Sequence, residues 1–122
     1  MRTIVFNQGF NRVENRCIIQ LERTKLNRLL DEERRIIEML TRSAEKIIKS
    51  KPQSLADSKI IWSNIINHRL VRDIRCRLDC LTDAYPQFVQ QVKAVRDLIK
   101  ERFLVAMDAL RDAAQISIYR PN

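Results

Sequence analysis

The residues best suited to chemistry lie between positions 61 and 80. His68 is the chain's one histidine, and three arginines follow it at helical spacing. At 100° per residue these four side chains share one third of a helix. Arginine binds phosphate or carboxylate through two parallel hydrogen bonds, and apolar neighbours strengthen such a surface. The predicted partner-binding surface comprises Ile61, Trp62, Ile65, His68, Arg69, Arg72 and Arg75.

Metal binding and catalysis are weaker interpretations of the same stretch. Cys76 and Cys80 lie four residues apart, a spacing that holds half of a zinc site on a helix. The remaining ligands are missing, since Cys17 is distant and no second histidine exists. We expect buried or half-buried free thiols, a surface or rim role for His68, and no catalytic, metal or cofactor site.

Composition then limits the elements that position these residues. The 122 residues include one Gly and three Pro, so few tight turns are available and long helices remain. Gly9 by itself cannot form a glycine-rich phosphate loop. Lys and Arg exceed Asp and Glu by 23 to 15, and the net charge of +8 favours acidic partners.

Apolar residues at three- and four-residue spacing predict three helices, over about residues 12–51, 54–81 and 86–115. These form a helical domain over 12–115, arranged as an elongated antiparallel three-helix bundle or coiled coil. Glu33 interrupts the apolar stripe of the first helix. A break near Asp31 is therefore an open alternative, and it would give four helices.

The chain ends are predicted to be short extended arms, residues 1–11 and 116–122. Three antiparallel helices put the two arms at opposite ends, so they would pair only between two chains. A partner would then meet apolar side chains of the arms, either as added strands or as pegs. The candidate contact residues in the arms are Ile4, Phe6, Ile116, Ile118 and Tyr119.

The sequence carries no signal-peptide pattern and no apolar run of about 20 residues that could span a bilayer. Three cysteines fit no disulfide framework. We therefore expect an intracellular protein, cytoplasmic or nuclear, with reduced thiols and no membrane partner.

These features favour a non-enzymatic protein–protein interaction or scaffold module, a homodimer or a subunit of a larger assembly. It would bind an acidic or apolar surface and no small-molecule substrate. The alternative is a basic helical protein that binds nucleic acid, with Arg34, Arg35 and Arg42 as further phosphate contacts.

A remote alternative is a small all-helical enzyme. A long first helix, the Lys51-Pro52 turn and two shorter helices resemble the outline of the all-helical chorismate mutases. That resemblance implies an intertwined dimer with a polar pocket. The residues in the pocket positions would be Arg23, Arg35, Lys46 and Gln115. The spaced Arg and Asp pattern of that family's first helix does not occur in this chain.

Overall fold

The computed structural model describes the backbone of residues 2–50 and 57–119, and the side chains of residues 16–50 and 57–114. Over these ranges the chain is helical and contains no strand, which confirms the predicted all-α class. The elements are α1 (Arg2–Ser50), α2 (Ser58–Ile66), α3 (Arg69–Ala84), a 3₁₀ turn η2 (Pro86–Phe88) and α4 (Val89–Tyr119).

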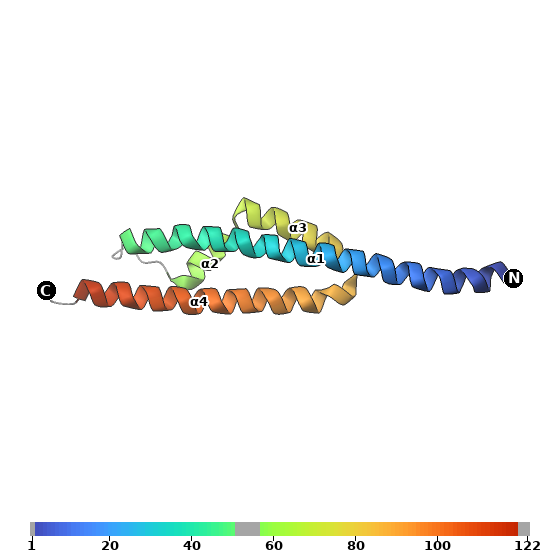
Figure 1. The fold of residues 1–122 in the computed structure, drawn as a ribbon. Helices are drawn as coiled ribbons and strands as arrows, with labels where there is room; N and C mark the ends of the chain where they lie inside the picture. The colour runs from blue at the N-terminus through green and yellow to red at the C-terminus, as the bar shows by residue number, and fades with distance from the viewer. Residues whose placement is uncertain (1, 51–56, 120–122) are drawn as a thin grey trace.

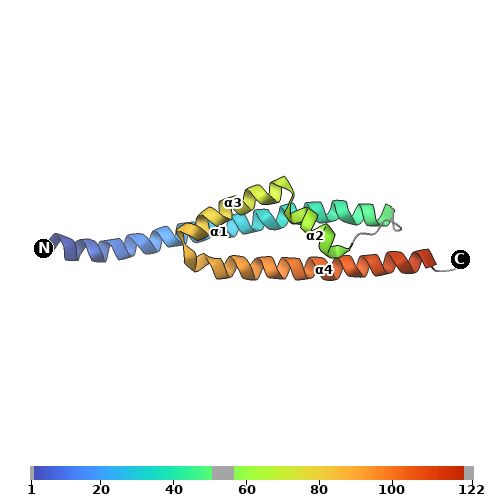
Figure 2. The same ribbon diagram turned by 180° about the vertical axis from the view of Figure 1, so that it is seen from behind.

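The helices lie side by side along one long axis (Figure 1). α1 runs in one direction, α2 and α3 return, and α4 runs in the same direction as α1. α3 packs on α1, whereas α2 packs mainly on α4, and Figure 2 shows the same arrangement from behind. The first residues of α1 and the last residues of α4 lie at opposite ends. The N-terminal part of α1 extends well beyond α3 and α4.

Two clusters of buried apolar side chains hold the helices together, and both draw on the predicted apolar stripes. The first cluster joins α1, α3, η2 and α4 through Leu26, Leu29, Leu30, Ile74, Leu78, Leu81, Phe88 and Val92. The second joins all four helices through Ile37, Ile48, Trp62, Ile65, Val71, Phe103 and Met107. Burial of such residues contributes about 25 cal/mol per Å² of apolar surface.

The prediction of one helix over residues 54–81 is wrong, because two helices occupy this stretch. The first begins at Ser58, after the N-cap Asp57, and the second ends at Ala84. His68 adopts φ −63° and ψ 139°, outside the helical region, and its side chain accepts a hydrogen bond from the Leu70 N–H at 3.2 Å. This is an N-cap interaction, in which a side chain satisfies a free donor of the first turn. The break also changes which residue faces the core at the start of α3. Val71 is fully buried there, whereas Leu70 is 43% exposed.

The alternative break near Asp31 is also wrong, because α1 continues through it. Glu33 occupies an apolar-stripe position without interrupting the helix. Its side chain is 1% exposed and is paired with arginines from α3 and α4. A paired carboxylate can be buried without the cost of an isolated charge.

The extended arms are a further wrong prediction. α1 begins at Arg2 and α4 continues to Tyr119, so residues 3–6 and 116–119 have helical backbone. Each arm offers only four residues with a strand-like pattern, which is too few to define a strand. Continuing a helix that already exists needs no new nucleation step, so the chain ends continue α1 and α4. Gly9 costs a helix only about 1 kcal/mol relative to Ala, which does not end it.

Candidate interaction surface

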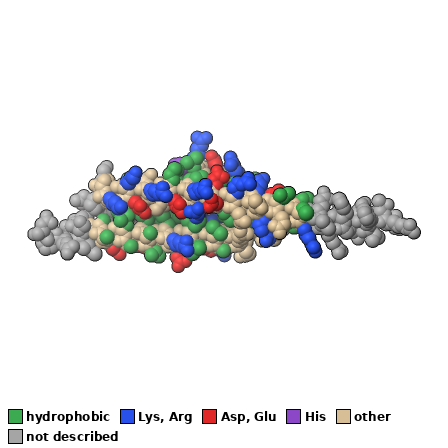
Figure 3. Space-filling view, in the orientation of Figure 1, with side chains coloured by type: hydrophobic (Ala, Val, Ile, Leu, Met, Phe, Trp, Pro, Cys, Tyr) green, Lys and Arg blue, Asp and Glu red, His purple; other side chains and the backbone are tan. Residues whose placement is uncertain are grey.

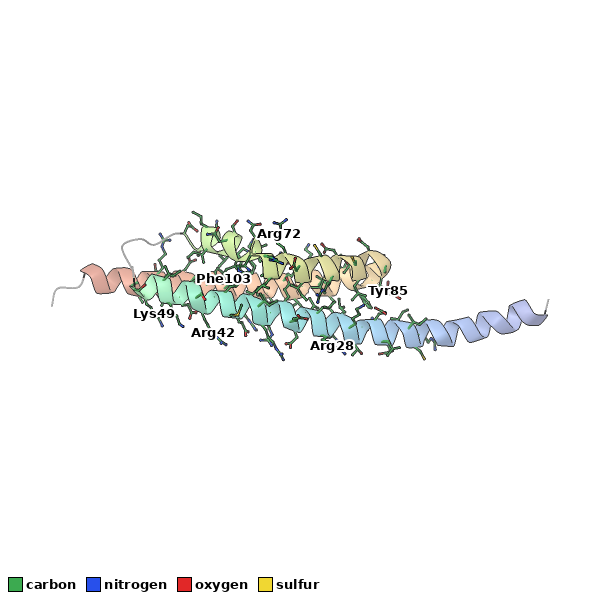
Figure 4. All side chains as sticks on the ribbon, turned by 90° about the horizontal axis from the view of Figure 1, so that it is seen from above. Arg28, Arg42, Lys49, Arg72, Tyr85 and Phe103 are labelled. Atoms are coloured by element: carbon green, nitrogen blue, oxygen red, sulfur yellow. The ribbon has the colours of Figure 1, made fainter. Side chains whose placement is uncertain are left out.

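The four residues of the predicted basic face, His68 and three arginines, make different contacts in the structure. His68 caps α3, and Arg75 Nε donates to Glu33 Oε1 at 2.6 Å. Arg69 is exposed and lies 3.9 Å from Asp73 on its own helix. Arg72 is exposed on the outer side of α3 (Figure 4). The four residues therefore do not form one free basic surface.

The apolar extension of that face is buried. Trp62 and Ile65 are 9% and 5% exposed, and Ile61 is half-buried. The Trp62 ring lies 5.0 Å from the Phe103 ring on α4, centroid to centroid, at 47°. Trp62 and Ile65 belong to the second core cluster and Ile61 packs against it, which leaves little of their surface for a partner. The reason is that α2 packs against α4 as well as α1.

The remaining predicted contacts lie at the chain ends. The backbone of Ile4, Phe6, Ile116, Ile118 and Tyr119 is helical, and their side chains lie outside the described residues. The three cysteines are free as predicted, but Cys17, Cys76 and Cys80 are exposed rather than buried. Within the described residues, no group of three His, Cys, Asp or Glu side chains could hold a metal ion.

A basic surface runs along α1, and of its residues only Arg35 and Arg42 were predicted as contacts. Arg28, Arg35, Arg42 and Lys49 are spaced by seven, so they follow one side of the helix at intervals of about 10.5 Å. We call these four residues, with Lys46, the basic row; all five side chains are exposed. Figure 4 shows Arg28, Arg42 and Lys49 on the same side of α1, away from Arg72. The seven-residue spacing was visible in the sequence and would have revealed the row.

An open groove separates the basic row from α4. Its wall on α1 includes Arg34, Glu38 and Arg42, and its wall on α4 includes Arg102 and Ala106. Ile37, Phe103 and Ile99 give the groove an apolar floor. In Figure 3, Lys and Arg side chains gather over α1 on this side of the molecule, and hydrophobic side chains follow α4. We call the side of the molecule that carries this groove and the basic row the open face.

The outer surface of α4 carries the opposite charge. At 100° per residue, Leu98 and Val105 lie outward from the groove residue Arg102, and carboxylates lie beyond them. Leu98 is 47% exposed and Val105 is 65% exposed. The carboxylates, here called the acidic row, are Asp97, Glu101, Asp108 and Asp112, all exposed.

Local ion pairs account for the other charges of α1 near the groove. Arg34 donates to Asp31 at 2.6 Å and to Glu38 at 2.7 Å, and Arg35 lies 2.9 Å from Asp31. The hydrogen bond from Arg34 lowers the pKa of Asp31, and the charge of Arg35 acts in the same direction. The same hydrogen bonds raise the pKa of Arg34. Arg34 is therefore occupied, whereas no ion pair of Arg28, Arg42, Lys46 or Lys49 occurs within the described residues.

In comparisons with known proteins, the chain matches no family model, and no curated protein or solved structure is significantly similar to it. Among the described residues, no helix is both long and apolar enough to cross a membrane.

Proposed function

We propose that this protein is a non-enzymatic interaction module that assembles as a homodimer of two helical bundles. One observation carries the proposal, namely the amount of surface that a single chain leaves uncovered. The accessible surface is 9348 Å² for a mass of 14.5 kDa. A compact monomer of this mass exposes about 6,900 Å². The elongated shape produces this excess, and an interface that covers roughly 800 Å² on each partner would reduce it.

The distribution of charge supports self-association. The net charge of +8 would make two copies repel each other if it were spread evenly. The acidic row of α4 provides a place where a second copy's basic surface is attracted instead. Exposed Leu98 and Val105 lie beside that row and would be covered by an interface.

Light scattering coupled to size exclusion tests the proposal on the full chain, because it reports mass independently of the elongated shape. We expect about 29 kDa, twice the 14.5 kDa of one chain, at about 50 mM salt and micromolar concentration. A mass of 14.5 kDa at every concentration would overturn the homodimer.

The basic row favours nucleic-acid binding as a second candidate. Five exposed cations along α1 could contact phosphates in a row. Against this, Glu38 and Glu45 line the groove beside them, and the aromatic residues Trp62 and Phe103 are buried rather than available for stacking. The test is titration of a labelled duplex and a single strand at about 50 mM and about 200 mM salt. No binding at the lower salt concentration would exclude this candidate.

A further inference from the structure

We infer that the two copies of the proposed dimer pack open face to open face, about a twofold axis parallel to the helices. The basic row of each α1 then faces the acidic row of the other copy's α4. This inference rests on the proposed homodimer and specifies its interface. It accounts for the acidic row and for Arg28, Arg42, Lys46 and Lys49 of the basic row, none of which forms an ion pair within the described residues, whereas Arg35 also pairs with Asp31.

Symmetry selects the direction of the axis. Two copies can meet face to face about a twofold axis in the plane of contact, either across the helices or along them. An axis across the helices sets α1 against α1, so the two basic rows oppose each other. An axis along the helices sets α1 against α4 of the second copy, and it does so twice. Only this second arrangement places unlike charges opposite each other.

The basic row and the acidic row also occupy similar positions along the helix axis, which we call their heights. Gln91 Nε2 donates to Asn27 Oδ1 at 2.8 Å, and Arg96 Nε donates to Glu33 Oε1 at 3.3 Å. Residues of α4 therefore lie level with α1 residues 63–64 positions earlier. An axis parallel to the helices preserves these heights in the second copy. In three oppositely charged pairs, the α4 residue comes 66 positions after the α1 residue. This separation exceeds that of residues at the same height by two or three, which is about 3–4.5 Å along the helix axis. They are Arg35 with Glu101, Arg42 with Asp108, and Lys46 with Asp112.

Apolar contact would fill the space between the charged rows. Leu98 and Val105 lie between the groove and the acidic row, where the aliphatic stems of the opposing arginines can cover them. The charges inside the groove do not oppose this contact, because Glu38 is paired with Arg34 and Glu45 lines the groove together with Arg42 and Arg102. The result resembles a coiled-coil seam flanked by ion pairs, which set partner choice and register.

The test uses two full-length variants that reverse opposite rows. R42E/K46E makes the basic row acidic, and D108K/D112K makes the acidic row basic. Each variant opposes like charges in its own homodimer, so we expect the dimer dissociation constant to rise at least about 10-fold for each. Mixing the two restores unlike charges at both halves of the interface. We therefore expect the mixture to form a one-to-one dimer at concentrations where each variant by itself is a monomer.

A matched control reverses two exposed arginines of α3, in R72E/R77E, which changes the net charge as much as R42E/K46E does. It should leave the dissociation constant of the dimer unchanged. Circular dichroism melts show whether each variant is folded, and recovery in the mixture cannot come from two unfolded chains.

The outcomes separate the two claims. A wild-type chain that is monomeric overturns the homodimer itself. A wild-type dimer whose dissociation constant is unchanged in both variants overturns only the inferred interface, as does a mixture that fails to pair. A monomer that binds duplex DNA, and loses that binding in R42E/K46E but not in D108K/D112K, would replace the inference with nucleic-acid binding.

Discussion

Arg75 on α3 donates a hydrogen bond from Nε to Glu33 Oε1 on α1 at 2.6 Å, and Glu33 is 1% exposed. Arg96 on α4 approaches the same carboxylate, with Nε 3.3 Å from Oε1 and 3.4 Å from Oε2. One buried charge therefore connects three helices at the level where α1 lies between α3 and α4. The Nη2 atom of Arg96 is buried and has no hydrogen-bond partner among the described residues.

Replacing Glu33 removes one partner of this buried ionic cluster and leaves two arginines without it. We expect Glu33→Gln to lower the free energy of unfolding by about 2–4 kcal/mol, somewhat less than for a fully buried pair, since both arginines are partly exposed. Urea unfolding followed by circular dichroism measures the change. Glu32→Gln, at an exposed neighbouring position, is the control and should change the free energy by less than about 0.5 kcal/mol.

The same cluster predicts a different result when all three charges are removed together. Replacing Glu33, Arg75 and Arg96 by Leu, Met and Met should leave stability near wild type or raise it, because apolar packing can replace a buried ion pair. A triple variant much less stable than Glu33→Gln would contradict this account. In that case the carboxylate would be needed for more than charge balance.

His68 separates α2 from α3 through its cap on the Leu70 N–H. Replacing His68 by Ala removes the capping acceptor, and we expect a loss of about 1 kcal/mol in unfolding free energy. His68→Asn restores a preferred capping side chain and should recover most of this loss. Thermal melts of the two variants check the order. Equal stability of His68→Ala and wild type would show that the cap contributes nothing.

Trp62 is the chain's one tryptophan, and it reports on the packing between α2 and α4. Phe103→Ala would remove the ring that lies 5.0 Å from Trp62 and open a cavity in the second core cluster. We expect a loss of about 3–5 kcal/mol and a red shift of the tryptophan emission as water reaches the indole. Ile60→Ala, at a 56% exposed position of α2 outside both core clusters, should change neither quantity appreciably.

Acid should weaken the ion pairs of Asp31. The pKa of this carboxyl is lowered in the folded chain by the hydrogen bond from Arg34. Its contribution to stability is therefore present above its unfolded pKa, near 4, and is lost as the pH falls through the lower folded value. Because the pair is exposed, Asp31→Asn should reduce the melting temperature only slightly at pH 7. It should have no effect at a pH low enough to protonate this carboxyl in the folded chain. A reduction of equal size at both pH values would exclude a charge effect.

Sequence patterns alone predict the helical class, the core stripe of α1 and the boundary at Tyr85-Pro86. Scarcity of Gly and Pro excludes sheets with tight turns, and three- and four-residue spacing records which side of a long helix is buried. These properties are local, so they are visible without knowing which helices meet. The seven-residue spacing of the basic row is equally local.

Tertiary structure decided the remaining features. Glu33 looks like an interruption of a stripe until Arg75 and Arg96, 42 and 63 residues away, are placed beside it. Ile61, Trp62 and Ile65 look like an exposed face until α2 is seen to contact both α1 and α4. The break at His68 follows from the same packing, because separate α2 and α3 can each present an apolar side to a different neighbour. Whether a side chain is buried depends on which helix packs against it, and the spacing of residues along one helix does not identify that neighbouring helix.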